Sequence, residues 1–397
     1  MNILVVCQYY FPEPFRLPDI CEAMAARGPQ VTVVTGTPNY PEGEIYPGYE
    51  KGRRSDENIG GVTIHRCPLI PRKRGILYRF LNYYSFVFSS CRYLRRVKEN
   101  YDVVFLNQLS PVMMAQAGLN WAKRHGKKAV LYCLDLWPES LCAGGIRPGS
   151  PIYRFFAGVS CRIYNKADKI LVTSKGFVPY LRDFLKIETP ISYLPQYAEN
   201  LFDNVPAREE RGGPYHFVFA GNIGDAQSVE TIIQAAGLLK EENAVFDIVG
   251  DGVSLEKCRQ LAQGLNNVIF HGRRDIAEME RFYSMADAML ITMRDNPTLA
   301  LTLPGKVQSY MAAGRAVIGA IGGETAALVK EADCGACVAA EDAAALAEAI
   351  REGLRAPEKL NTWGINARAW YQHYFRKEAF LDILEKELEA ACEENEG

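Results

Sequence analysis

The sequence predicts an α/β protein with two parallel-sheet domains that face each other across a cleft. The chain has 397 residues, more than one hydrophobic core usually supports, and its 48% hydrophobic and 23% charged content is typical of a globular protein. Short apolar runs alternate with helical patterns in both halves, which implies right-handed βαβ units. We expect domains at 1–204 and 205–375, because Glu199–Pro214 is polar and rich in Pro and Gly.

A series of apolar runs predicts the strands of the first half, and a helix is expected over 16–27, closed by Gly28. The runs are Ile3–Cys7, Val31–Thr35, Val103–Leu106, Ala129–Leu134 and Lys169–Thr173. A dinucleotide-binding domain would follow its first strand with a glycine-rich turn, yet the first glycine of this chain is Gly28. This argues against a nicotinamide or flavin dehydrogenase.

The second half repeats the pattern and ends in a long helical segment. Its predicted strands are Phe217–Ala220, Phe246–Val249, Val268–Phe270, Ala288–Thr292 and Ala316–Ile318. The final segment, Ile365–Glu394, starts with aromatic residues and ends acidic. We expect it to pack across both halves, since no third domain is predicted after it.

The loop after Phe217–Ala220 is the first candidate for a ligand site. Gly221 and Gly224 would let a diphosphate approach the backbone, and the amphipathic helix predicted after Gln227 would favour an anion at its N-terminus. Asn222 and Ile223 complete this loop. An ordinary βα turn is the alternative, because a single glycine loop is a weak signal.

A second candidate loop opens the helix predicted over 303–314, with Pro304 near its first position and Gly314 as its stop. Lys306 then lies in the first turn, next to Gly305, where the helix dipole repels a cation. An anionic ligand explains this placement, and a solvated surface lysine is the alternative. We expect both helix N-termini to converge on one anion, while Gly250 and the loop with Gly272 and Arg273 frame a base and ribose.

Asp135 directly follows the predicted strand Ala129–Leu134, and Glu139 comes four residues later. Ligands bind at the carboxyl ends of parallel strands, so Asp135 is a candidate catalytic residue. A paired-carboxylate hydrolase and a simple turn cap remain alternatives. The loop Gly36–Gly43 could hold a sugar by hydrogen bonds and stacking, although turn formation alone explains its Pro and Gly content.

Composition limits the cofactors and the location. No secretory signal and no apolar span of membrane length is recognised, so a cytoplasmic protein with reduced thiols is expected. Of eleven cysteines, only Cys334 and Cys337 have a metal-like spacing, and they lack the further ligands of a zinc site. No metal is expected. Residues 1–200 hold 26 Lys/Arg against 16 Asp/Glu and residues 201–397 hold 19 against 31, so the halves are expected to meet different partners.

Residues 68–98 mix cations with aromatic and aliphatic side chains and are expected to contact an anionic membrane surface. A core helix with a solvated basic face is the alternative, and nucleic acid is not expected as a partner. The cations are Arg72, Lys73, Arg74, Arg79, Arg92, Arg95, Arg96 and Lys98, and the apolar residues run from Ile76 to Phe88.

Taken together, the motifs resemble a GT-B glycosyltransferase of the large retaining family four, over essentially the whole chain. They also resemble the branch with the N-acetyl-L-fucosamine transferases of bacterial O-antigen and capsule assembly. The motifs are Thr37–Gly43, Asp135–Ser140, Gly221–Gly224 with Gln227, Pro304–Lys306 and Ser309–Gly314. The resemblance implies two Rossmann-like domains, an acceptor site mainly in the first, a sugar-nucleotide site mainly in the second, no required metal, and a C-terminal helix 376–397 that packs back on the first domain.

The sequence departs from the family pattern at four positions. Asn222 and Gln227 stand where the family has an arginine and a lysine, and Leu301 and Ser309 replace a pair of glutamates. The leaving diphosphate must then be stabilised by the helix N-termini, Lys306 and Arg16, with Ser309 assigned to the ribose. Asp135 stands where many relatives have a histidine that contacts the reacting sugar.

The predicted activity is retaining transfer of a sugar from a nucleotide diphosphate sugar to a lipid-diphosphate-linked saccharide in surface polysaccharide synthesis. The donor is expected to be UDP-linked, with UDP-N-acetyl-L-fucosamine or another N-acetylated sugar as candidates, and no cofactor besides this substrate is expected. The predicted catalytic residues are Asp135, Lys306 and Arg16. The protein is expected to act at the inner face of the cell membrane. A nucleotide-sugar epimerase or hydrolase, and a non-catalytic nucleotide-sugar-binding partner, remain alternatives.

Overall fold

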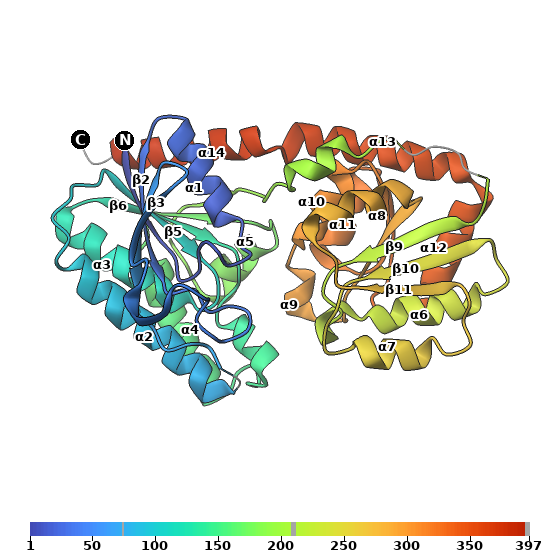
Figure 1. The fold of residues 1–397 in the computed structure, drawn as a ribbon, viewed down its shortest axis with the longest axis horizontal. Coiled ribbons are helices and arrows are strands. Elements are labelled where there is room, and N and C mark those ends of the chain that lie inside the picture. Colours follow the sequence, from blue (N-terminus) through green and yellow to red (C-terminus); the bar gives the residue numbers. More distant parts are fainter. Residues whose placement is uncertain (74, 208–211, 394–397) are drawn as a thin grey trace. The chain divides into compact units, whose positions relative to one another are not determined.

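A computed structural model describes residues 1–73, 75–207 and 212–393, which form two compact units, each with its own sheet (Figure 1). The first unit comprises residues 1–173, 177–194 and the C-terminal residues from 381. The second comprises residues 174–176 and 195–380. Among the described helices, none is long and apolar enough to cross a membrane.

The first unit contains an eight-stranded sheet in the order β3-β4-β2-β1-β5-β6-β7-β8, in which only β3 and β4 pair antiparallel. Its strands are β1 (Asn2–Val6), β2 (Gln30–Gly36), β3 (Asp56–Ile59), β4 (Val62–Cys67), β5 (Val103–Gln108), β6 (Lys128–Cys133), β7 (Lys169–Val172) and β8 (Ile191–Tyr193). The central strands β1 and β5 are continuously buried because helices cover both faces of the sheet.

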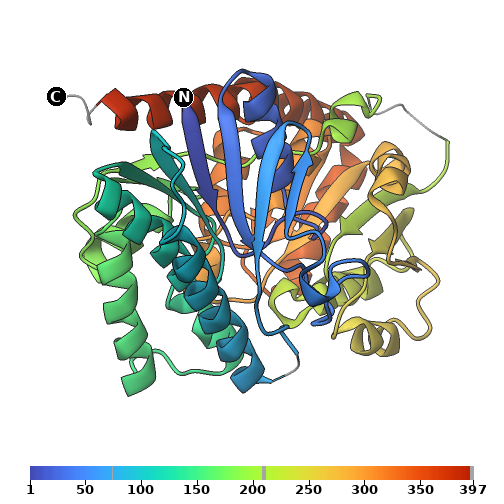
Figure 2. The ribbon, with the colours of Figure 1, turned by 60° about the vertical axis from the view of Figure 1, so that its left-hand side comes forward.

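Helices α2 (Ile76–Leu94), α3 (Gln116–His125) and α4 (Pro151–Tyr164) cover one face of this sheet, and α1 (Leu17–Ala26) lies on the other (Figure 1). A short α5 (Phe177–Pro179) precedes β8. Figure 2 shows α2 and α4 side by side, where Phe80 stacks on Phe156 with ring centroids 5.6 Å apart.

The second unit contains a six-stranded parallel sheet in the order β11-β10-β9-β12-β13-β14. Its strands are β9 (Tyr215–Ala220), β10 (Ala244–Val249), β11 (Val268–Gly272), β12 (Ala288–Thr292), β13 (Ala316–Ala320) and β14 (Gly335–Val338). Its helices are α6 (Val229–Leu238), α7 (Leu255–Leu261), α8 (Met279–Met285), α9 (Pro297–Ala300), α10 (Gly305–Ala312), α11 (Gly323–Glu331), α12 (Ala343–Arg355) and α13 (Pro357–Tyr374).

Alternate residues of β9 supply the two cores of this unit. Val218 and Ala220 pack in one core with residues of α8, α10, α11 and α13. Phe217 and Phe219 face the other core, with α6, α7 and α12. This two-residue period is what a strand covered on both faces requires.

The sequence interpretation missed four strands. It also placed the two domain boundaries at 204 and 375, whereas the units divide after Leu194 and Phe380. β3, β8 and β14 have three or four residues, and all four missed strands, β4 included, carry polar or glycine residues, so they lack the continuous apolar runs that predicted the others. Cys337 lies within β14. At Gly335 a Cβ would stand 1.8 Å from the carbonyl oxygen of Val317, so only glycine allows this strand to pair.

The N-terminal part of the first unit ends at Leu194, ten residues before the boundary expected at 204, because Ala198, Phe202 and Val205 are buried in the core of the second unit. Of the predicted connection Glu199–Pro214, residues 208–211 lie outside the described part of the chain.

The final helical segment is two helices, α13 and α14 (Lys377–Glu393), separated at Phe375 and Arg376, and Glu394 is outside the described residues. α14 begins in the second unit and belongs to the first from Leu381 on. Two α14 carboxylates, Asp382 and Glu385, lie 2.8 and 3.0 Å from Arg27, the C-cap residue of α1. Glu387 pairs with Lys169 of β7 at 3.2 Å.

Candidate functional site

Three strand-end loops of the second unit are joined by their backbones. They follow β9, β10 and β11, and because the strands are parallel, their loops leave the same edge of the sheet. The joining hydrogen bonds run from Gly221 N–H to Val249 C=O (2.9 Å), from Ile223 N–H to Asp251 C=O (2.8 Å) and from Gly250 N–H to Gly272 C=O (2.9 Å).

Glycine is required where these loops touch. A Cβ at Gly250 would stand 1.8 Å from the carbonyl oxygen of Gly221, and one at Gly252 would stand 2.4 Å from that of Ile223. Gly221 and Gly250 also have φ of +146° and +141°. The predicted glycine positions therefore keep the β9 and β10 loops in direct backbone contact, while the side chain of Ile223 is fully buried.

Lys306 reaches the same glycine loop from the first turn of α10. Its Nζ would be 2.9 Å from a Cβ at Gly221 and lies 4.2 Å from the ring centre of Phe219. The ammonium is buried and has no hydrogen-bond or ion-pair partner among the described residues. Burial lowers the pKa of Lys306 to about 8. An unpaired buried cation is costly, so this geometry is suited to an anion that supplies the missing counter-charge.

The helix predicted over 303–314 is present as α10, two residues shorter at each end. Pro304 is its N-cap residue, Gly305 begins the helix, and Gly314, with φ of +64°, follows its C-cap. The helix predicted after Gln227 is present as α6, but the sequence did not predict the structure between Gly224 and that helix. A 3-10 turn, η6 (Asp225–Gln227), and a left-handed Ser228 intervene, so α6 starts only at Val229.

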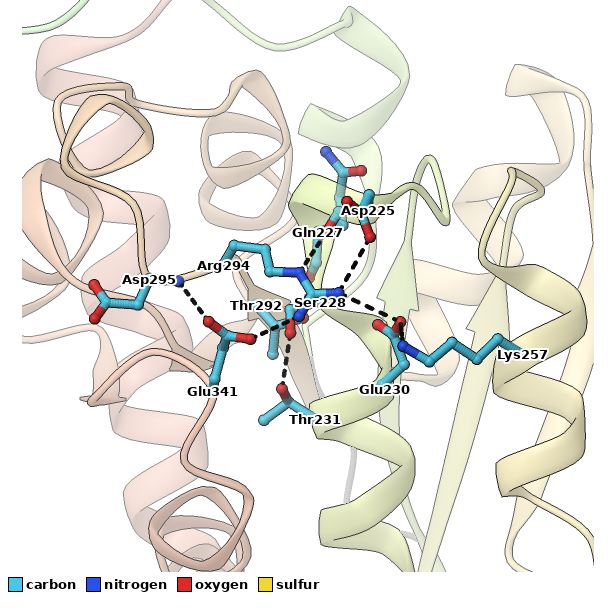
Figure 3. A network of polar contacts seen from close by, with 10 residues as sticks. All are labelled: Asp225, Gln227, Ser228, Glu230, Thr231, Lys257, Thr292, Arg294, Asp295 and Glu341. Carbon is cyan, nitrogen blue, oxygen red and sulfur yellow. Dashed lines mark hydrogen bonds and ion pairs between the residues drawn. The ribbon is translucent and has the colours of Figure 1, made fainter. Parts of the chain in front are cut away.

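A salt-bridge network holds that 3-10 turn (Figure 3). Arg294, just after β12, donates through Nε to the carbonyl oxygen of Asp225 (3.0 Å) and pairs with the Asp225 carboxylate (3.1 Å). The guanidinium also lies 2.8 Å from Glu341 and 3.8 Å from Glu230, whose carboxylate pairs with Lys257 at 3.0 Å. These partners lie far apart in sequence, so the sequence could not predict the network. Only the position of Arg294 after a strand could have marked this residue as a candidate for the site.

The side chains at the two altered family positions bond to each other. Asn222 Nδ2 donates to Gln227 Oε1 at 3.2 Å, and both groups lie beside Gly224. The turn is also tied to β12, since Thr292 Oγ1 donates to the Gln227 carbonyl oxygen at 2.7 Å. The loop thus presents neutral amides where the family pattern has cations.

Ser309 lies one turn after Lys306 on α10 and is almost fully buried. Its hydroxyl donates to Glu199 Oε2 at 3.4 Å, which places a carboxylate beside the residue predicted to hold the ribose. Glu199 comes from the segment before η5 (Asn200–Asn204), and no local pattern identified it. Arg273 is exposed beside Gly272, and Leu301 is the C-cap of α9.

In the first unit, Asp135 follows β6 and is fixed by the neighbouring loop after β5. Its Oδ2 accepts hydrogen bonds from the N–H and the hydroxyl of Ser110, both at 3.1 Å. Oδ1 has no hydrogen-bond partner in the described parts of the chain. Burial raises the pKa of Asp135, and the two bonds from Ser110 oppose that rise. One carboxylate oxygen is therefore held and the other is available.

Arg16 and Glu139 differ in their relation to Asp135. Arg16 is the N-cap residue of α1, and its charge acts on Tyr132, the β6 residue three positions before Asp135. Glu139 instead accepts hydrogen bonds from the hydroxyls of Tyr153 and Tyr180 (the latter 2.9 Å), whereas Asp135 accepts from Ser110. This separation gives no support to the paired-carboxylate alternative.

The loop containing Asn39 is built by a buried carboxylate that the sequence interpretation did not single out. Glu13 accepts hydrogen bonds from the N–H groups of Tyr10 (3.1 Å), Asn39 (2.8 Å) and Tyr40 (2.7 Å), and burial raises its pKa to about 7. The Asn39 side chain is itself buried and accepts from the Arg72 N–H at 2.9 Å. Asn39 therefore shapes the loop rather than presenting its amide to a ligand.

Helix α2 has both a core face and an exposed apolar face. Tyr83, Phe86, Ser90 and Leu94 are buried. Leu77, Leu81, Tyr84 and Phe88 are exposed and recur at helical spacing, so they form one stripe, called here the α2 stripe. Of the predicted cations, Arg74 lies outside the described residues.

Two protein-family models match this chain, one in each of the two units. The model for a glycosyl transferase 4-like domain matches residues 16–195, and the model for glycosyl transferases group 1 matches residues 214–356. WcaI of Escherichia coli K12, named as a glycosyl transferase of colanic acid biosynthesis, is 26% identical over 385 residues, which cover 90% of this chain and 93% of WcaI.

Two solved structures share the whole fold. Sucrose-phosphate synthase from Thermosynechococcus elongatus superposes with a TM-score of 0.76 at 19% identity, covering 98% of this chain and 99% of that one. Anabaena HepE, solved in complex with UDP, gives a TM-score of 0.70 at 14% identity, covering 98% and 100%. Both are two-sheet GT-B structures, and at this identity the likeness establishes the fold.

Proposed function

Because this chain belongs to glycosyltransferase family 4, with group 1 and 4-like domains that together span most of its length, we propose that it transfers a sugar from a UDP-sugar to a lipid-linked saccharide. The observation that carries the donor assignment is the buried ammonium of Lys306, which has no counter-charge among the described residues and lies at Gly221. A diphosphate at this loop would accept its charge.

The remaining donor contacts are assigned from the same loops. The backbone N–H groups of Asn222 and Gly224, and the side-chain amides of Asn222 and Gln227, would donate to the diphosphate, because the N–H groups of Gly221 and Ile223 already bind Val249 and Asp251. Ser309 and the Glu199 carboxylate would accept from the ribose hydroxyls, and the loops at Gly250 and Gly272 with Arg273 would frame the base. Uridine is favoured because HepE, which shares this fold, was solved with UDP.

Asp135 is proposed to act on the acceptor hydroxyl or to orient the donor sugar. Ser110 fixes one carboxylate oxygen and leaves Oδ1 to meet the substrate. With retention of configuration, as the family resemblance implies, the leaving diphosphate would be stabilised by Lys306 and Arg16. No step requires a metal ion in this scheme.

The acceptor is proposed to be a lipid-diphosphate-linked saccharide of surface polysaccharide synthesis, such as O-antigen or capsule, with an N-acetylated sugar such as N-acetyl-L-fucosamine transferred to it. The name of WcaI supports the polysaccharide class. The α2 stripe supports contact with the inner face of the cell membrane, since an apolar helix face next to the cations Arg92, Arg95 and Arg96 suits anionic lipid.

Thermal unfolding with UDP, GDP and NAD, each with EDTA and then with magnesium, tests the donor site. Ligand at a hundredfold excess over its Kd stabilises a protein by about 2.7 kcal/mol, which is a shift of several degrees. UDP alone should raise the Tm of the wild type and of the control Lys240→Met, an exposed lysine of the same unit, but not of Lys306→Met. Equal shifts in both variants would contradict the assignment, and consumption of UDP-sugar without acceptor would favour a hydrolase.

A further inference from the structure

The first unit contains a groove of about 560 Å³ beside the α2 stripe. One wall is the segment that leaves β4, from Arg66 to Ile70. The other is the C-terminal half of α2 and the residues just after it, namely Ser85, Phe88, Ser89, Arg92, Tyr93 and Arg96. Phe88, 73% exposed, belongs to both the groove and the α2 stripe, so the two surfaces are continuous.

The walls of the groove are mostly apolar, and most of its polar groups are already used. The Ser85 hydroxyl accepts from the Ile70 N–H at 2.9 Å and donates to the carbonyl oxygen of Asn82. The Ser89 hydroxyl donates to the Phe86 carbonyl oxygen at 3.1 Å. These groups have little capacity left for a polar ligand.

The charge of one lining arginine is also used internally. The Arg66 side chain is buried, pairs with Glu57 and donates to the carbonyl oxygen of Phe11 at 3.0 Å. Arg92 and Arg96 are different, because both are exposed and their side chains make no ion pair or hydrogen bond with any described residue. The groove therefore combines an apolar slot with two cations, one helical turn apart, at one end.

We infer that this groove holds an acyl chain of an anionic phospholipid, with the phosphate on Arg92 and Arg96. An apolar slot that ends in two uncompensated cations is complementary to an amphiphile with a negative headgroup. The continuity with the α2 stripe would place the groove at a membrane surface. Arginines at the C-terminal end of α2 could simply stabilise the helix dipole. That explanation does not account for the open apolar walls beside them.

The occupant differs from the saccharide acceptor. The groove lies along β4 and α2, and three strands, β2, β1 and β5, separate β4 from β6, which carries Asp135. Neighbouring strands are about 4.8 Å apart, so this separation is about 19 Å along the sheet. The site is thus a lipid seat in addition to the proposed catalytic loops, and it does not depend on donor binding.

Binding of monomeric dihexanoyl phosphatidylglycerol and phosphatidylcholine to the full-length protein, followed by calorimetry, tests the inference. The anionic lipid should bind at least about tenfold more tightly. Two variants should each weaken its binding about tenfold or more: Ser89→Trp, which fills the slot, and the double variant R92Q/R96Q. The control R154Q/K166Q removes the same charge from α4 and the turn just after it, and should bind like the wild type. Far-UV circular dichroism verifies the fold of each variant.

Equal binding of both lipids would overturn the lipid seat. Loss of binding in R92Q/R96Q but not in Ser89→Trp would also overturn it, because that result indicates binding by surface charge only. If Ser89→Trp does not fold, Phe88→Ser removes a wall at an exposed position and should weaken binding in its place. A dimer that is lost in Ser89→Trp, together with no lipid binding, would assign the groove to a second copy. None of these results depends on a UDP-sugar, so failure here leaves the transferase proposal untouched.

Discussion

At the scale of single residues, Lys306 is a cation for which the described protein supplies no counter-charge. The sequence could predict it because the cost is local: a lysine in the first turn of a helix is unfavourable wherever the helix packs. Glu13, Glu199 and Arg294 could not be predicted in this way. Each has a partner that lies between about 25 and 110 residues away along the chain, and only the fold brings the two together.

Lys306 makes donor binding sensitive to pH. Its pKa falls from the ordinary 10.5 to about 8 in the free protein, so above pH 8 a bound diphosphate must restore a proton. The UDP Kd should rise with pH between about 8 and 10, up to about tenfold per pH unit. Calorimetry across this range, with Lys306→Met as the matched control, checks the effect. A Kd that stays constant to pH 9.5 would contradict it.

The same pKa shift predicts the stability of the unliganded protein. Between pH 8 and 10.5 the unfolded chain binds more protons at this lysine than the folded chain does, so stability rises with pH across that window. The difference in Tm between the wild type and Lys306→Met should therefore change in favour of the wild type as the pH is raised from 8 to 10. A difference that stays flat would show that the folded lysine titrates like an exposed one.

Asp135→Asn tests the proposed acceptor chemistry. Transfer should fall at least about a hundredfold if the carboxylate moves a proton, while the UDP-induced Tm shift stays unchanged. Because burial raises the pKa of Asp135, the acid limb of the wild-type rate profile should lie above the ordinary range of an aspartate. Glu139→Gln, which changes a carboxylate of the same loop, should retain most activity. Near-normal turnover in Asp135→Asn would end the assignment.

At the scale of elements, prediction worked where a segment's environment is uniform. Strands such as β1 and β5 are buried on both faces, and their apolar runs identify them. Strand β4 alternates buried and exposed residues, and Gly335 of β14 is required for backbone pairing and not for apolar burial. The turn η6 was missed because tertiary bonds to Arg294 and Thr292 fix it.

Arg294→Met should loosen η6 and weaken donor binding. Without the guanidinium, Asp225, Glu230 and Glu341 lose their shared counter-charge beside the proposed diphosphate loop. We expect the KM for the UDP-sugar to rise about tenfold with little change in kcat, because the effect is on binding. Arg259→Met, an exposed arginine of α7, is the control. Asp225→Asn in the Arg294→Met background should restore part of the affinity, and no rescue would mean that charge is not the cause.

At the scale of the whole molecule, α14 belongs to both units. Leu384 and Leu388 are fully buried, and both lie in the part of α14 that belongs to the first unit. Leu384→Ala should lower the free energy of unfolding of the first unit by about 2–5 kcal/mol, whereas Lys386→Ala, at an exposed position, should have little effect. Differential scanning calorimetry with and without UDP separates the units, because UDP should stabilise the second unit only. A loss of stability confined to the UDP-sensitive transition would contradict this assignment.

This arrangement of α14 also sets an order of events during synthesis. Ribosomes make the first sheet before the second unit, and domains usually fold in the order in which they emerge. Here the first unit receives Leu384 and Leu388 only after residues 195–380 have been translated. The nascent first unit therefore emerges without the segment of α14 that belongs to it, and the part of the protein that is translated first is the part that is completed last.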